Sequence, residues 1–176
     1  MSFNERELRN ALGHFATGVA IITAEVDGNR LGATISSFNS VSLNPALVLF
    51  SMARSAYGFL QWQRAKSVAV WVLRENQTEL SNRFARSQSD KWSGIEELRT
   101  ANGAPSLPNW LAYFLCERYA RYDGGDHEIF VSRVTEFGTA KSDPTPLVFY
   151  AGRYRALKPE QIGPLLPDDN MWLHGW

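Results

Sequence analysis

Cysteine is almost missing from this sequence: Cys116 stands alone, so no disulfide can form within the chain. Net charge is missing too, because eighteen basic residues balance eighteen acidic ones, and this argues against a basic nucleic-acid-binding surface. No apolar run reaches the ~20 residues that a membrane-spanning helix needs, and the opening MSFNERELRN lacks the apolar core of a signal peptide. These absences predict a cytoplasmic protein with neither a nucleic-acid nor a membrane partner.

The common signatures of enzyme chemistry are missing as well. There is no Gly-x-Gly-x-x-Gly fingerprint after a strand, no Gly-Lys-Ser/Thr phosphate loop and no Gly-x-Ser-x-Gly elbow. His14, His127 and His174 lie far apart and are not accompanied by cysteine pairs, so we expect no metal site. Cys116 lies inside an apolar run, which favours a small buried side chain over a nucleophile.

Aromatic residues, in contrast, are abundant, with six Trp, six Tyr and ten Phe in 176 residues. A chain of this length forms one domain with a sizeable core. Large aromatic side chains fill cores, but they also form dimer interfaces and stack on planar ligands. Trp62, Trp110 and the tail residues Trp172 and Trp176 are candidates for packing between two subunits, although some of them could fill the core of one chain instead.

Hydrophobic periodicity predicts many strands and few helices. Asn4 is a potential N-cap for the first helix, and Asp27-Gly28-Asn29 is a tight turn between two strands. The run 110–122 fits helix or strand, and its aromatic residues favour a strand. The expected helices are 4–15, 55–65 and 76–87, and the expected strands are 18–26, 30–36, 46–52, 67–73, 110–122, 127–138 and a pair over 146–157 broken at Gly152. Such a series predicts an antiparallel barrel or sandwich with peripheral helices, a loop over 88–110 and a surface tail over 158–176.

One segment, GATISSFNSVSLNP over residues 32–45, is rich in hydroxyl groups although it lies between two apolar runs. Thr34, Ser36 and Ser37 have hydroxyls suited to a phosphate, and the Gly-Ala pair before them leaves room for a ligand at the backbone. By itself, the segment is better explained as a turn whose hydroxyls bond to their own backbone.

Two further segments strengthen the ligand-binding interpretation. NRFARSQSDKW places Arg83, Arg86 and Lys91 near one helix end, where they either meet a phosphate or remain solvated. GGDHEIF places Asp126 and His127 at a turn that leads into a strand. That pair is either a plain turn or an imidazole presented to a ligand.

Five segments together resemble the flavin reductase-like family: LRNALGHFATGVAIIT, GATISSFNSVSLNPALVLF, QTELSNRFARSQSDKWSG, GDHEIFVSRV and PLVFYAGRYRAL. Their order and spacing match across about residues 8–157. The resemblance implies a mainly β fold, the FMN-binding split barrel, in which a split antiparallel β-barrel carries short peripheral helices. It implies that this domain spans 1–157 and is followed by a tail, 158–176. It also implies a homodimer with flavin near the subunit interface.

The same resemblance implies a set of site residues. Thr34 and Ile35 would flank the isoalloxazine ring, and Lys91 would lie near the phosphate. His127 would donate a hydrogen bond to the nicotinamide carboxamide, with Asp126 holding the turn or the imidazole tautomer. The implied flavin contacts are Thr34, Ile35, Ser36, Ser37, Ser51, Ser55, Phe84, Ala85, Lys91 and Trp92.

The implied activity is an NAD(P)H-dependent flavin reductase. Hydride would pass from NADH or NADPH to FMN or FAD, and diffusible reduced flavin would serve a partner monooxygenase. The chain departs from the family pattern at Trp71, where Asn is frequent, and at Ser132, where Gly is frequent. Two alternatives stay open: a flavin carrier without nicotinamide turnover, which the bulky Trp71 suggests, and a reductase of another acceptor such as a ferric chelate or a corrinoid.

Overall fold

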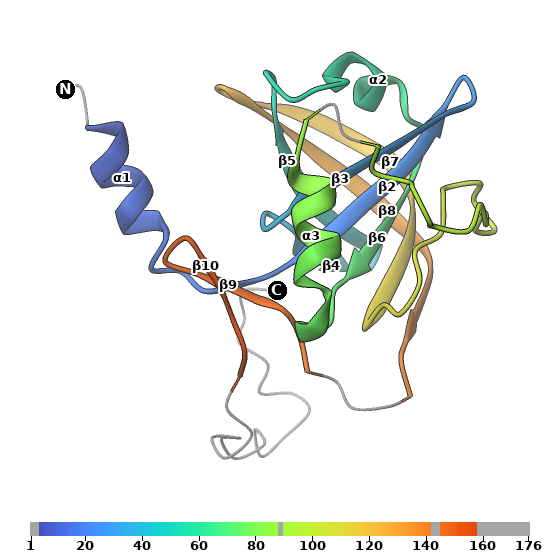
Figure 1. Ribbon diagram of the computed structural model, residues 1–176. Helices are drawn as coiled ribbons and strands as arrows, with labels where there is room; N and C mark the ends of the chain where they lie inside the picture. The colour runs from blue at the N-terminus through green and yellow to red at the C-terminus, as the bar shows by residue number, and fades with distance from the viewer. Residues whose placement is uncertain (1–3, 88–89, 142–144, 158–176) are drawn as a thin grey trace.

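A computed structural model describes residues 4–87, 90–141 and 145–157. Its main feature is a seven-stranded antiparallel sheet with the strand order β3-β2-β6-β7-β8-β5-β4, curled into a barrel (Figure 1). The strands of this sheet are β2 (Ala20–Val26), β3 (Asn29–Ile35), β4 (Asn39–Leu43), β5 (Ala46–Ala53), β6 (Ser67–Val72), β7 (Ala112–Gly124) and β8 (His127–Thr139). A small second sheet has the order β1-β9-β10, with β1 (Thr17–Gly18), β9 (Val148–Tyr150) and β10 (Arg153–Arg155).

The barrel is split between β3 and β4. These two strands are the ends of the sheet and are not paired with each other. Only the short segment 36–38 joins them along the chain. The predicted fold class, a split antiparallel barrel with short peripheral helices, is confirmed.

The β2–β3 hairpin shows how local sequence determines this architecture. Asp27 and Gly28 both have positive φ values, 52° and 76°, as a two-residue turn between twisted strands requires. The resulting register places Ile21 opposite Thr34. The predicted hairpin is therefore confirmed, and its register places the hydroxyl-rich segment at the open end of the barrel.

Alternating residues of the central strands fill two separate cores. Ile22 and Val70 belong to the cluster inside the barrel, where Phe50 and Phe130 stack with ring centroids 5.1 Å apart. Their neighbours along the strands, such as Trp71, belong to a second cluster on the outer face, under the helix α3 (Thr78–Ala85) and β9. Because both faces are covered, six of the seven residues of β2 are buried, and its sequence does not alternate between apolar and polar residues.

All three predicted helices are present, but their bounds differ from those predicted. They are α1 (Glu5–Leu12), α2 (Phe59–Arg64) and α3 (Thr78–Ala85), and a 3₁₀ turn, η1 (Glu75–Gln77), precedes α3. The side chain of Asn4 caps α1 by accepting from the backbone N–H groups of Arg6 and Glu7, as predicted. The prediction that the second helix begins at Ser55 is wrong, because Gly58 adopts φ 74° and ends the preceding turn.

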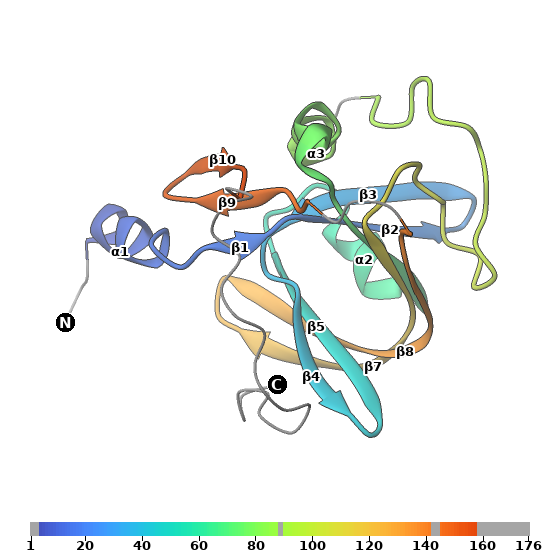
Figure 2. The ribbon, with the colours of Figure 1, turned by 90° about the horizontal axis from the view of Figure 1, so that it is seen from below.

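Helix α1 projects away from the barrel (Figures 1 and 2). None of its residues is buried. Its end touches the β9–β10 turn through the Ala151 N–H, which donates to the Gly13 carbonyl at 2.8 Å. The apolar stripe of this helix is thus uncovered in a single chain.

Other sequence predictions have mixed outcomes. The strands over 110–122, 127–138 and the broken pair over 146–157 are confirmed, as is the irregular course of residues 90–110. Strands β1 and β4 were not predicted. The expected tail, 158–176, lies outside the described residues. Within the described part of the chain, no helix is long and apolar enough to cross a membrane.

Candidate functional site

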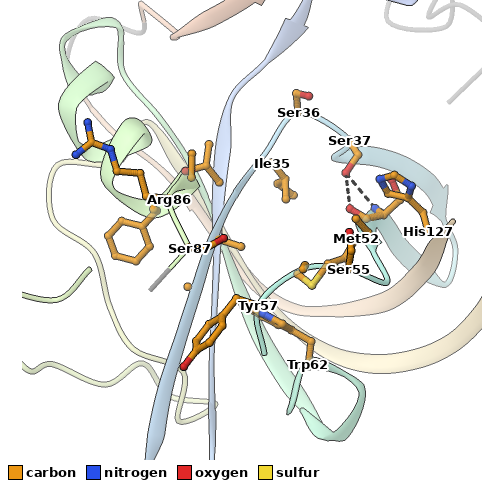
Figure 3. Close-up of a pocket in the computed structure, with 18 of the residues that line it drawn as sticks. Ile35, Ser36, Ser37, Met52, Ser55, Tyr57, Trp62, Arg86, Ser87 and His127 are labelled. Carbon is orange, nitrogen blue, oxygen red and sulfur yellow. Dashed lines mark hydrogen bonds between the residues drawn. The ribbon is translucent and has the colours of Figure 1, made fainter. Parts of the chain in front are cut away.

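A cavity of about 470 Å³ opens at the split of the barrel. Its walls come from the end of β3, the segment after it, the end of β5, the turn over 55–57, the end of α3 and the first residue of β8 (Figure 3). Ile35, Met52 and Trp62, three residues of the interior cluster, supply its apolar lining. The split therefore exposes part of the barrel core to a ligand-sized space.

Two of the hydroxyl groups that line this site, those of Thr34 and Ser37, bond to backbone groups. Thr34 Oγ1 donates to the Ser81 carbonyl of α3 at 2.6 Å. Ser37 Oγ donates to the Ser51 carbonyl and accepts from the Ser51 N–H, both at 3.0 Å. The first bond joins β3 to α3, and the other two join the segment after β3 to β5. The hydroxyls thus bond to backbone groups, as in the plainer interpretation of the segment, although their partners lie in other elements.

The backbone of β3 meets α3 at Gly32. A Cβ atom at this position would lie 2.3 Å from Cε1 of Phe84, so the ring occupies the space that a side chain would need. Gly32 and Ala33 nevertheless both line the cavity, so the expectation that a ligand approaches the backbone there stays a prediction. Lys91 Nζ donates to the Gly32 and Phe84 carbonyls, at 2.9 and 3.0 Å, and holds the two elements together.

The charges at the cavity are positive. Among the described lining residues there is no carboxylate, whereas Arg86 and Lys91 are both present. Partial burial lowers the pKa of the Lys91 ammonium because desolvation disfavours its charged form. An anion placed nearby would reverse that effect. The third predicted cation, Arg83, does not line the cavity and donates to the Ser93 carbonyl.

His127 enters from the opposite side of the view in Figure 3 to Arg86. It is the first residue of β8 and pairs with Ala53 of β5, which brings it to the cavity. Its Nδ1 lies 2.7 Å from Oδ1 of Asp126. The hydrogen bond with His127, and then the charge of the imidazole, lower the pKa of the Asp126 carboxyl.

The structure brings together every site residue predicted from the sequence except Trp92, which lines an adjoining cavity. Phe84 contributes little side-chain surface, since it is only 1% exposed. Sequence reasoning missed Tyr57, Met52 and Trp62. For Tyr57 there was a signal: the glycine after it, which favours a turn rather than the predicted helix.

Trp71 and Ser132, the two departures from the family pattern, lie away from the cavity. The Trp71 indole is buried in the outer cluster, and its Nε1–H donates to Thr23 Oγ1 at 2.9 Å. Ser132 is buried in β8, opposite Val48. Neither residue reshapes the cavity, so the observation that suggested a flavin carrier no longer supports it.

The remaining predictions from the sequence concern metals and the lone thiol. The described residues contain no group of three or more His, Cys, Asp or Glu side chains placed to hold a metal ion. Cys116 is fully buried, and burial raises the pKa of its thiol to about 12. Its assignment as a small buried side chain is confirmed.

Comparison with known proteins adds the family context. Residues 12–158 match the model of the flavin reductase like domain. The chain is 40% identical to the FMN reductase (NADH) SmoA of Agrobacterium fabrum, over 86% of this chain and 85% of that protein. It is 34% identical to HsaB, the reductase subunit of a flavin-dependent monooxygenase of Rhodococcus jostii, over 93% and 83%.

A solved structure agrees with the sequence comparisons. The crystal structure of nitrilotriacetate monooxygenase component B from Mycobacterium thermoresistibile superimposes with a TM-score of 0.89 at 33% identity, covering 96% of this chain and 95% of that one. With the split barrel, the carboxylate-free cavity and these matches together, the chain belongs to the flavin reductase-like family.

Proposed function

We propose that this protein uses NADH to reduce FMN or FAD and supplies the reduced flavin to a partner monooxygenase. The observation that carries the proposal is the cavity at the split. It combines an apolar slot, two cations, several hydroxyls and an imidazole, and the described residues lining it include no carboxylate. Such a lining suits a planar ring attached to a phosphate.

When bound, the flavin supplies the hydride acceptor, and the nicotinamide supplies the hydride. The protein then binds, orients and shields the two rings, and needs no nucleophile of its own. Ile35 and Met52 provide apolar contact for the flavin ring, and Lys91 and Arg86 provide charge for its phosphate. We expect His127, which lines the cavity, to orient the nicotinamide.

The test is NADH oxidation at limiting and at excess FMN and FAD, with the flavin content of the isolated protein measured in parallel. We expect turnover that saturates with added flavin. The same assay with NADPH, ferric chelates and a corrinoid decides the donor and the acceptor. Saturable flavin binding without NADH oxidation would contradict the proposal and favour the alternative of a flavin carrier without nicotinamide turnover.

We also propose a homodimer in the cytoplasm, a compartment with which the single free cysteine agrees. Leu8 and Leu12 on α1, and Phe15 three residues after its end, are 47%, 66% and 76% exposed. An amphipathic helix of eight residues is not stable without a surface to cover. A second subunit provides such a surface.

Of the tryptophans expected at the interface, Trp172 and Trp176 lie outside the described residues. Trp62 is 4% exposed within one chain, so the prediction that it packs across subunits is wrong. Trp110 packs edge to face on Tyr113, with ring centroids 4.8 Å apart. We expect Leu12→Asp to shift the protein toward monomer in sedimentation, whereas Leu98→Asp, at another exposed leucine, leaves it unchanged. A monomeric wild type at micromolar concentration would refute the dimer.

A further inference from the structure

A second cavity, of about 480 Å³, adjoins the proposed flavin site. The two cavities share Gly32, Tyr57, Trp62 and Lys91 as lining residues. The Lys91 ammonium is therefore at their boundary, held there by its bonds to two carbonyls. A ligand whose phosphate lies at Lys91 in the first cavity extends into the second cavity if it carries a further group beyond that phosphate.

The second cavity has planar surfaces for an aromatic base. Tyr57 is 65% exposed although it lines both cavities. The Trp92 indole is fixed by its Nε1–H, which donates to the Arg30 carbonyl at 3.3 Å, and by Phe84, which meets it edge to face. The guanidinium of Arg30 lies over that indole, 4.9 Å from the ring centroid. Bases stack readily on tyrosine rings and on guanidinium planes.

The charged groups of the second cavity suit the rest of a nucleotide. Arg30 and Lys91 are cations able to hold a phosphate. Asp90, which is exposed, accepts from the Trp92 N–H at 3.3 Å and keeps oxygen lone pairs free for the hydroxyls of a ribose. Phosphate, sugar and base contacts thus lie in one cavity that begins at the phosphate end of the other.

We propose that this second cavity binds the adenosine monophosphate half of a dinucleotide, namely that of FAD. The inference rests on the proposed function, because it places the flavin phosphate at Lys91. FAD would then fill both cavities, whereas FMN fills only the first. Stacking of one base corresponds to ~5- to 150-fold in affinity, so we expect FAD to bind at least fivefold more tightly than FMN.

Arg30→Ala is the variant that tests the proposal, since Arg30 lines the second cavity and not the first. Calorimetric titration with FAD and with FMN gives both dissociation constants directly. We expect the affinity for FAD to fall five- to twentyfold and the affinity for FMN to stay within twofold. Unchanged FMN binding also reports that the neighbouring fold is intact. Lys141→Ala, at an exposed lysine outside both cavities, is the control that removes the same charge.

A kinetic comparison identifies the source of the nucleotide. The KM values of wild type and Arg30→Ala are measured with NADH and with reduced nicotinamide mononucleotide, which lacks the adenosine half. If Arg30→Ala raises only the KM for NADH and leaves FAD binding unchanged, the cavity still binds adenosine monophosphate but takes it from the nicotinamide dinucleotide, and the assignment to FAD is overturned.

Two other results would overturn the subsite. One is an equal loss of FMN and FAD affinity, and the other is no effect on FAD binding or on the KM for NADH. Either can occur while wild type oxidises NADH normally with FMN, in which case the proposed function stands and only the subsite fails. A wild type that binds FAD more tightly than FMN but oxidises no NADH would instead refute the proposed function alone.

Discussion

Replacing His127 by alanine is the sharpest test of how this protein orients its hydride donor. The contact between Nδ1 and Oδ1 of Asp126, 2.7 Å long, places the ring proton on Nδ1. In a neutral imidazole Nε2 is then an acceptor. The sequence-based expectation was a donor to the nicotinamide carboxamide; with this tautomer we propose instead that Nε2 of His127 accepts from the carboxamide NH₂ group.

The size of the effect follows from the lost contact and its exposure. A single hydrogen bond contributes ~0.5–1.5 kcal/mol, and a misoriented nicotinamide lowers the rate further because hydride transfer needs reacting atoms ~3–3.5 Å apart. Together these terms give a ~10- to 100-fold loss of kcat/KM for NADH. The His127 side chain is 43% exposed, so solvent can replace part of the contact, and we expect a value nearer tenfold.

The assay is steady-state NADH oxidation at saturating flavin, alongside flavin titration and a melting curve. His127→Gln is the matched control, since its amide oxygen restores an acceptor and should recover part of the activity. Asp126→Ala removes only the group that sets the tautomer and should cost less than His127→Ala. Unchanged kinetics with a lower melting temperature would show that His127 only caps β8, and an equal loss of flavin affinity would place it on the flavin instead.

Three further predictions follow from single residues. Gly32→Ala forces the Phe84 ring to move, so we expect a loss of ~1–3 kcal/mol from overpacking and a melting temperature ~2–12 °C lower, measured by calorimetry. Cys116, with its pKa raised to about 12 by burial, should resist iodoacetamide at pH 8 in the native protein and react only after unfolding, as mass spectrometry would show. The pKa of Lys91 is lowered by desolvation, so its charge is present below that lowered pKa and is lost as pH rises through it. FMN affinity should consequently fall as pH rises through that lowered pKa, which lies below the usual lysine range, whereas riboflavin, which lacks the phosphate, and the Lys91→Met variant should show no such fall.

Local signals in the sequence predicted the elements that depend on neighbouring residues. Asp27-Gly28 determines the first hairpin because both residues tolerate positive φ. Asn4 determines the start of α1 through its side-chain oxygen. The start of α2 was missed because Gly58 was read as a helical residue, although it has the left-handed backbone conformation that glycine favours.

Long-range register determined what the sequence could not predict. His127 reaches the cavity because it pairs with Ala53, a residue 74 positions earlier in the chain. Nothing near His127 specifies that partner. The same holds for Trp71, whose side of the sheet depends on pairing with Ile21 of β2 and Tyr113 of β7.

The hydroxyl-rich segment 32–45 combines two roles that composition alone does not separate. The hydroxyls of Thr34 and Ser37 each donate their only hydrogen bond to a backbone carbonyl. Toward a ligand they can therefore only accept hydrogen bonds. A phosphate needs donors, whereas the hydroxyls of a ribityl chain can donate. We therefore propose that Thr34 and Ser37 contact the ribityl chain and that the cations Arg86 and Lys91 hold the phosphate. Loss of the Ser37 hydroxyl would then weaken both its hydrogen bonds to Ser51 and the ribityl contact. Loss of the exposed Ser36 hydroxyl would leave the bonds between Ser37 and Ser51 intact.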